Sequence, residues 1–305
     1  MELFKQNTKI DFMGARKWTA ILSAVLFLFS LGSLMVNGLE WGLDFTGGTQ
    51  IEVKYQQEAN LSTIRQQLSA AGFSQAEVIS YGNSTDVLIS IGTQANLNQN
   101  EIVAKVMQAL PGATEQRHDY VGAQVGHELA TKGALAIIVS LLATMIYIAM
   151  RFEFRLAVSS SAALIHDPLL ILGIFSFFHI TFDLKVLGAL LAVIGYSLND
   201  TIVVFDRVRE NFRKLRRATP LEIMNLSINQ TLSRTIMTSV LTLVVVVALF
   251  VYGGETIHGF SLAFMIGIVI GTYSSIYVAG ALALVLGLSR KDLLPSAKQL
   301  VDDRP

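Results

Sequence analysis

Cysteine is absent from this chain of 305 residues, and charged residues are scarce. Without cysteine the protein has no disulfides and no thiolate ligands for a metal. Only 15% of the residues are charged and the formal net charge is zero, so the total charge indicates no nucleic-acid partner. The sequence also lacks the G-x-x-x-x-G-K-[ST] loop that holds nucleotide phosphates. We therefore expect no enzymatic activity, no cofactor and no metal site, and an ion gradient as the energy source for any work.

Apolar residues make up 52% of the chain and give a mean hydropathy of +0.52, which is typical of a membrane protein. A helix needs about 20 largely apolar residues to cross about 30 Å of hydrocarbon. Six runs of about this length are present, at 18–36, 133–150, 156–178, 184–205, 235–251 and 260–288. We predict an α-helical membrane protein with six transmembrane helices, the last five forming a bundle at 133–288. The first is an uncleaved anchor, because no small-residue cleavage site follows it.

Lys and Arg residues are concentrated on one side of the predicted spans. Of the 23, 17 fall in the segment 1–17, between the second and third spans, within 207–234, or after the last span. Cytoplasmic loops of membrane proteins are rich in Lys and Arg. We therefore expect the N-terminal segment 1–17 and the tail 289–305 to be cytoplasmic.

Nearly a hundred residues, 37–132, lie between the first two spans, too many for a connecting loop. The pattern predicts a strand, a helix, a hairpin, a second helix and a last strand, in "TQIEVKY", "LSTIRQQLSAAG", "AEVISYGNSTDVLISIG", "NQNEIVAKVMQALPG" and "ATEQRHDYV". This βαββαβ order predicts a small α+β ferredoxin-like domain in the periplasm. Folds of this type serve many functions, so the fold alone assigns none.

The predicted cytoplasmic segment 207–233 combines a basic run with an amphipathic pattern. Thr219, Pro220 and Glu222 have the form of a helix start with a capping box. Apolar residues then recur at helical spacing, at Leu221, Met224, Ile228 and Leu232. This pattern favours an amphipathic helix that contacts membrane lipids in the headgroup layer. A docking site for a cytoplasmic partner is the alternative.

Small residues occupy every fourth position along the last predicted span. They are Ala263, Gly267, Gly271, Ser275, Ala279, Ala283 and Gly287. Such a row lets a second helix backbone approach closely, so we predict a helix-packing face. A groove for a substrate or a lipid along the same face is the alternative.

Ionisable residues inside the spans are the candidate functional residues, because a charge at the bilayer centre costs about 2.5–3.5 kcal/mol. Asn199 and Asp200 lie in the inner third of the fourth span. Asp200 is either a titrating group on an ion path or a structural residue of the bundle. His166 and Asp167, midway through the third span, form either a site or a local kink at the proline that follows. Arg234 opens the fifth span, where it can reach Asp200 or serve as an interfacial anchor.

Five stretches of the sequence, in this order and around six predicted spans, resemble the SecF family of protein translocase subunits. They are "WGLDFTGGTQIEV", "HD" in the third span, "GYSLNDTIVVFDRVREN", "NQTLSRTIMTS" and "GTYSSIYVAGALAL". The family belongs with the resistance-nodulation-division (RND) type of transporters and is located in the bacterial inner membrane. The resemblance implies a partner, SecD, that supplies six further spans. It also implies that proton flow helps to draw a preprotein through the SecYEG translocon.

The same resemblance implies roles for two charged residues. The Asp of the "SLND" motif and the Arg of the "TLSRT" motif are associated with proton transport in the family, which places these roles on Asp200 and Arg234. Pro168 departs from the family pattern, in which an aliphatic residue follows the His-Asp pair. This departure leaves the local shape of the third span open.

Two other classes of function remain as alternatives at this stage. An intramembrane aspartyl protease would use Asp167 and Asp200 as paired carboxylates that share a proton. An exporter of small lipidic molecules would use the same architecture with an apolar pocket in a larger outer domain. The coupling ion is open as well, because a carboxylate beside hydroxyls such as those of Ser197 and Thr201 suits either protons or sodium.

Overall fold

The computed structural model describes residues 9–94 and 97–293, and six of its helices are long and apolar enough to cross a membrane. The long helices are α1 (Arg16–Val36), α5 (Ala123–Arg151), α6 (Phe154–Phe177), α7 (Leu184–Lys214), α8 (Pro220–Tyr252) and α9 (Glu255–Tyr273). A π-helical turn, η2 (Ser274–Val278), joins α9 to α10 (Ala279–Val285), and short helices η1 (Met13–Ala15) and α11 (Arg290–Leu293) lie near the two ends of the described chain. The prediction of six membrane spans is confirmed.

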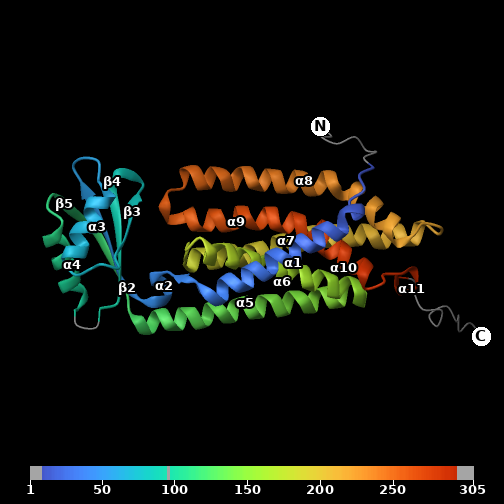
Figure 1. Ribbon diagram of the computed structural model, residues 1–305, viewed down its shortest axis with the longest axis horizontal. Helices are drawn as coiled ribbons and strands as arrows, with labels where there is room; N and C mark the ends of the chain where they lie inside the picture. Colours follow the sequence, from blue (N-terminus) through green and yellow to red (C-terminus); the bar gives the residue numbers. More distant parts are fainter. Residues whose placement is uncertain (1–8, 95–96, 294–305) are drawn as a thin grey trace, which may run out of the picture.

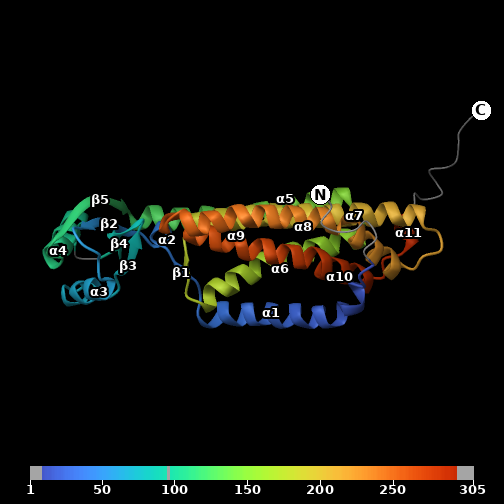
Figure 2. The same cartoon turned by 90° about the horizontal axis from the view of Figure 1, so that it is seen from above.

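The long helices run side by side, with a small α+β region at one end and α11 at the other (Figures 1 and 2). Helix α6 is central, since 61% of its most apolar segment is buried, whereas the corresponding figure for α5 is 11%. Half of the corresponding segment is buried in α7. His166 and Asp167 of α6 and Ser197 and Asp200 of α7 are buried inside the bundle, while α1, α5 and α8 present broad apolar faces outward.

The first part of the row of small residues on the last span, Gly267 and Gly271, lies against α7 of the same chain, whereas α10, with Ala279 and Ala283, packs mainly on α6. A Cβ atom at Gly267 would collide with the side chain of Val193, and one at Gly271 would lie 3.0 Å from Ser197 Cβ. Ala263, Ala279 and Ala283 are fully buried. Close approach of the two helices requires side chains of this size. Gly267 and Gly271 thus determine how closely α7, with its polar residues, packs on the last span.

The amphipathic segment 207–233 does not form a separate surface helix. Helix α7 extends to Lys214 and α8 begins at Pro220, after a capping box in which Thr219 and Glu222 bond to each other's backbone N–H groups. The apolar positions Met224, Ile228 and Leu232 are buried in the core of the bundle. The interpretation of a helix lying in the headgroup layer was therefore wrong, because the apolar stripe is covered by the chain's own helices.

Residues 10–13, just before the first span, pack onto α8. The backbone of Ile10 exchanges two hydrogen bonds with the side chain of Asn229, at 3.0 and 2.8 Å. Asn225 accepts a bond from Met13 N–H at 2.9 Å and donates one to Asp11 at 2.7 Å. Met13 is fully buried. The predicted boundary at residue 17 therefore falls inside α1, and an ordered strap precedes that helix.

The α+β domain consists of six elements between the first two long helices. They are β2 (Gly48–Tyr55), α3 (Leu61–Ala70), β3 (Glu77–Tyr81), β4 (Asn83–Gly92), α4 (Gln99–Ala109) and β5 (Ala113–Val121). The strands form one antiparallel sheet in the order β3-β4-β2-β5. Alternate residues of β2 and β4 share a core with both helices, through Ile51, Val53, Val87, Ile89, Ile64, Leu68, Ile102 and Val106. Both helices thus cover one face, as the strand periodicity requires.

A short connection, the junction (residues 40–48 with 181–183), joins this domain to the bundle. Strand β1 (Glu40–Trp41) pairs in parallel with β6 (Thr181–Phe182), and the single turn α2 (Leu43–Thr46) follows β1. Gly47 and Gly48 have φ values of 75° and 150°, in the region that favours glycine. A Cβ at Gly47 would lie 2.7 Å from the Cα of Ala123, so the chain entering the domain touches the helix that leaves it.

Candidate functional site

Asp200 lies inside the bundle on α7, about 24 Å along the helix from Leu184 at 1.5 Å per residue. The side chain is 3% exposed, and Oδ2 has no hydrogen-bond partner among the described residues. Burying a carboxylate without compensation is costly, so the neutral, protonated form is favoured at such a position. Asp200 is therefore placed to change charge when its surroundings change.

A cleft of about 390 Å³ adjoins this position, at the side of the bundle distal to the α+β domain. Its lining comes from α7 and α8 and includes Asn199 and Arg234, together with Ile202, Val203, Asp206, Arg207, Glu210, Gln230 and Thr231. Arg234 is exposed, and no direct ion pair joins it to Asp200 among the described residues. The structure thus brings Asn199, Asp200 and Arg234 to one region, with the arginine at the open side.

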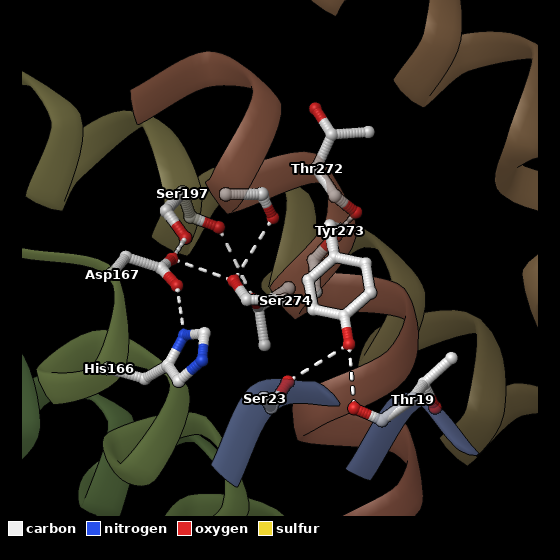
Figure 3. Close-up of polar contacts among 11 residues, drawn as sticks. Thr19, Ser23, His166, Asp167, Ser197, Thr272, Tyr273 and Ser274 are labelled. Atoms are coloured by element: carbon white, nitrogen blue, oxygen red, sulfur yellow. Dashed lines mark hydrogen bonds and ion pairs between the residues drawn. The ribbon is translucent and has the colours of Figure 1, made fainter. Parts of the chain in front are cut away.

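Asp167 occupies a different environment, a network of three hydrogen bonds (Figure 3). Oδ2 accepts bonds from Ser197 Oγ on α7 at 2.5 Å and from Ser274 Oγ in η2 at 2.7 Å. Oδ1 lies 3.0 Å from Nδ1 of His166. The carboxyl is 1% exposed, so it joins three helices in the interior. Such a carboxyl is held in place by its partners.

His166 supplies a second buried group without a partner. Its Nε2 atom is buried and has no hydrogen-bond partner within the described part of the chain. The imidazole stacks on Phe27 of α1, with ring centroids 6.3 Å apart and planes within 6°. With Nδ1 engaged by Asp167, Nε2 is the ring nitrogen that has no partner.

Helix α6 passes through Pro168 without interruption, from Phe154 to Phe177. A proline in a helix removes one backbone hydrogen bond, yet here the helix is continued by packing on α1 and α7. The third span is thus one helix that contains Pro168, and the alternatives for His166 and Asp167, a site or a local kink, stay predictions.

Sequence reasoning missed the hydroxyl groups of the last span. The π-helical turn at Ser274 brings its hydroxyl to Asp167, and Tyr273 Oη bonds Thr19 O at 2.8 Å and Ser23 Oγ at 2.9 Å (Figure 3). π-helical turns are rare and frequent at functional sites. The signal in the sequence was the run "TYSS", which places four hydroxyl-bearing residues in a membrane span.

Asp167 and Asp200 share no hydrogen bond among the described residues. Asp167 is saturated by His166, Ser197 and Ser274, whereas Asp200 Oδ2 is unpartnered. An aspartyl-protease pair needs two carboxyls that share one proton. This geometry gives no support to the protease alternative.

A family described as "Protein export membrane protein SecD/SecF, C-terminal" matches residues 101–289, and one described as "SecD/SecF GG Motif" matches residues 32–59. The chain is 46% identical to the protein translocase subunit SecF of Pseudomonas aeruginosa, with 97% of this chain and 98% of that protein covered. The chain belongs to the SecF family. The SecF of Vibrio alginolyticus is 47% identical, with 96% of this chain and 95% of that protein covered. A multi-pass bacterial membrane protein is therefore established.

Two solved structures of SecDF share the fold. The crystal structure of SecDF from Thermus thermophilus, described as a translocon-associated membrane protein, matches with a TM-score of 0.83 and 33% identity over 93% of this chain. SecDF in a super-membrane-facing form matches with a TM-score of 0.71 at the same identity and coverage. The SecF-family chain spans about two fifths of each SecDF chain, 39% and 40%. The unequal scores show that the two SecDF structures differ within the region matched by this chain.

Proposed function

We propose that this chain is the SecF subunit of a SecDF complex that assists preprotein export through SecYEG by coupling ion flow to movement of the polypeptide. Protons are the ion that the site favours, and sodium is the alternative. The observation that carries the proposal is Asp200, a buried carboxyl whose Oδ2 has no partner among the described residues and which follows Asn199, a lining residue of the cleft that contains Arg234. A group of this kind gains a proton readily and loses it when a cation approaches.

The cycle follows from the charges around Asp200. In the protonated state the carboxyl is neutral and is tolerated in the interior. When the Arg234 guanidinium moves toward it, the ionised form is stabilised and the proton is released. Asn199 lines the cleft at this point and can bind the water or ion that passes. Alternation between these states gives one direction of ion flow and one movement of α7 for each cycle.

Asp167 and His166 take a supporting role on the same path. Three hydrogen bonds hold Asp167, and Nε2 of His166 is the polar atom of this pair that has no partner among the described residues. Ser197 connects the pair to α7 three residues before Asp200, on the same side of the helix. We infer that a change of protonation at Asp200 shifts α7 and thereby alters the hydrogen bond between Ser197 and Asp167.

The remaining assignments concern the whole assembly. SecD supplies the six further spans, and these spans and membrane lipids cover the apolar faces that α1, α5 and α8 present outward. The α+β domain is of the ferredoxin-like type, supported by its βαββαβ order and by the strand order β3-β4-β2-β5.

The α+β domain lies in the periplasm and both termini lie in the cytoplasm. This orientation is supported by the placement of Lys and Arg. The difference between the two SecDF structures supports a working cycle with at least two arrangements.

The test is reconstitution of this chain with its SecD partner and SecYEG in vesicles carrying a trapped preprotein intermediate. Completion of export should depend on an imposed proton gradient and stop when an ionophore dissipates it. The matched control is SecYEG without the SecDF complex. Gradient-independent completion, equal with and without this chain, contradicts the proposal. A sodium gradient that replaces the proton gradient would identify sodium as the ion.

A further inference from the structure

We propose that Asp44 is a positioning residue that couples helix α7 to the central strand of the α+β domain. The inference rests on the proposed function. It adds the element through which an ion-driven movement of α7, the helix that carries Asp200, reaches the domain outside the membrane.

The coupling begins with one hydrogen bond across 140 residues of sequence. Asp44 Oδ2 accepts a bond from the backbone N–H of Leu184, the first residue of α7, at 3.1 Å. Carboxylates at helix N-termini meet unpaired N–H groups and a partial positive charge. Asp44 therefore holds α2 against the N-terminus of α7.

Helix α7 has its own cap, so the Asp44 bond is not required to begin the helix. Asp183 precedes α7 and accepts a bond from Val186 N–H at 2.8 Å. Burial raises the pKa of the Asp183 carboxyl, and the nearby Asp44 carboxylate adds to the rise. Both acids thus bind the N-terminus of α7, but in different roles. Asp183 is the residue directly before the helix and caps it, whereas Asp44 connects the helix to α2, which is distant in sequence.

The contact between Asp44 and α7 is supported by side-chain packing and by backbone hydrogen bonds. Gly42 N–H donates to Phe182 O at 2.9 Å beside the β1–β6 pair. Phe45, one residue after Asp44, is buried and stacks on Phe182 with centroids 5.9 Å apart and planes at 20°. Phe45 shares a core cluster with Val186 and Leu187 of α7. Helix α2 is thus held at the start of α7 by Asp44 and Phe45, and it also packs closely on α5, where a Cβ at Gly126 would lie 2.8 Å from Phe45 O.

The connection from α2 to the sheet is short and tight. Gly47 leaves α2, and Gly48 begins β2, pairing with Gly92 of β4 on one side and Val121 of β5 on the other. A Cβ at Gly47 would press on Ala123, and one at Gly48 would collide with the carbonyl of Ile91. Because β2 lies between β4 and β5, a displacement of α2 would move β2, an interior strand to which both neighbouring strands are hydrogen-bonded. Gly47 and Gly48 thus form a close-packed connection between α2 and β2.

Three substitutions in the reconstituted complex test this role. Asp44→Ala removes the bond to α7, and we expect ion flow to persist while gradient-driven export falls about tenfold. Asp44→Asn keeps an acceptor oxygen but loses the charge assistance, so export should fall by about two- to threefold. Asp183→Ala is the matched control, because it removes a cap from the same helix end without cutting the connection to α2. Export and ion flow should stay coupled in that variant.

Spin labels report the movement directly, and the absence of cysteine lets them be placed at Ser84→Cys and Lys185→Cys, both exposed positions. In the parent complex the domain moves with the start of α7, so the distance between the labels should stay the same when the gradient is applied, and it should change in Asp44→Ala, where α7 moves without the domain. An unchanged distance in Asp44→Ala, or full export in both Asp44 variants, overturns the coupling role. Equal uncoupling by Asp183→Ala overturns it too, because capping alone would then explain the loss. A parent complex that exports without any dependence on the gradient overturns the proposed function itself.

Discussion

Asp200→Asn should abolish gradient-driven export while the complex assembles normally. Asparagine keeps the shape of the side chain and can hydrogen-bond, but it cannot gain or lose a proton. Positioned proton transfer is worth about 10² to 10⁴-fold in rate, so stimulation by the gradient should fall at least about 100-fold. The measurement is export by vesicles that contain the variant chain, its SecD partner and SecYEG, with co-purification as the check on assembly.

Glu128→Gln is the matched control for this result. Glu128 is a carboxyl on α5, outside the cleft, where it is exposed and pairs with Lys132 at 2.7 Å. Exposed ion pairs contribute little, so export should remain close to that of the parent chain. Full stimulation in Asp200→Asn would show that α7 carries no essential proton at this position.

Asp167→Ala should produce the largest loss of stability in the chain. The substitution leaves three donors, on His166, Ser197 and Ser274, without their shared acceptor in the interior. Removing one member of a buried polar network costs about 3–5 kcal/mol. For a chain of this size we expect the unfolding midpoint of the detergent-solubilised protein to fall by about 10 °C or more, measured by thermal melting.

Asp167→Asn separates the stabilising role from a proton-carrying one. The amide keeps one acceptor oxygen, so the loss of thermal stability should be smaller than in Asp167→Ala. Asp119→Ala, in an exposed ion pair with Arg117 on the α+β domain, serves as the control and should leave the midpoint unchanged. A midpoint of Asp167→Ala equal to that of the parent protein would contradict the network described for Asp167.

Features that depend on neighbouring residues in sequence could be predicted, and features that depend on helix packing could not. The six spans, the strands of the α+β domain and the capping box of Thr219 follow from local patterns of apolar and polar residues. The hydrogen bonds from Ser197 and Ser274 to Asp167 depend on which faces of α6, α7 and the last span meet. No periodicity within one helix specifies that choice.

The same distinction explains the segment 207–233 and the junction. An amphipathic stripe is identical in sequence whether lipid headgroups or other helices cover it, so Met224 and Ile228 gave no sign that they are buried in the bundle. Asp44 was part of a motif that carried the family resemblance, but its partner lies 140 residues away. Asp200 and Arg234 were found because ionisable residues in an apolar span are costly enough to need a reason.

The measurement that tests the central claim most directly is a pH titration of the Asp200 carboxyl by infrared difference spectroscopy in the reconstituted complex. Our account predicts a protonated-carboxyl signal that titrates, disappears in Asp200→Asn and persists to higher pH in Arg234→Ala, because the guanidinium stabilises the ionised form. Arg234→Lys keeps the charge without the planar fork and should give an intermediate titration. An Asp200 carboxyl that stays ionised throughout, or whose titration is the same with and without Arg234, would contradict the account.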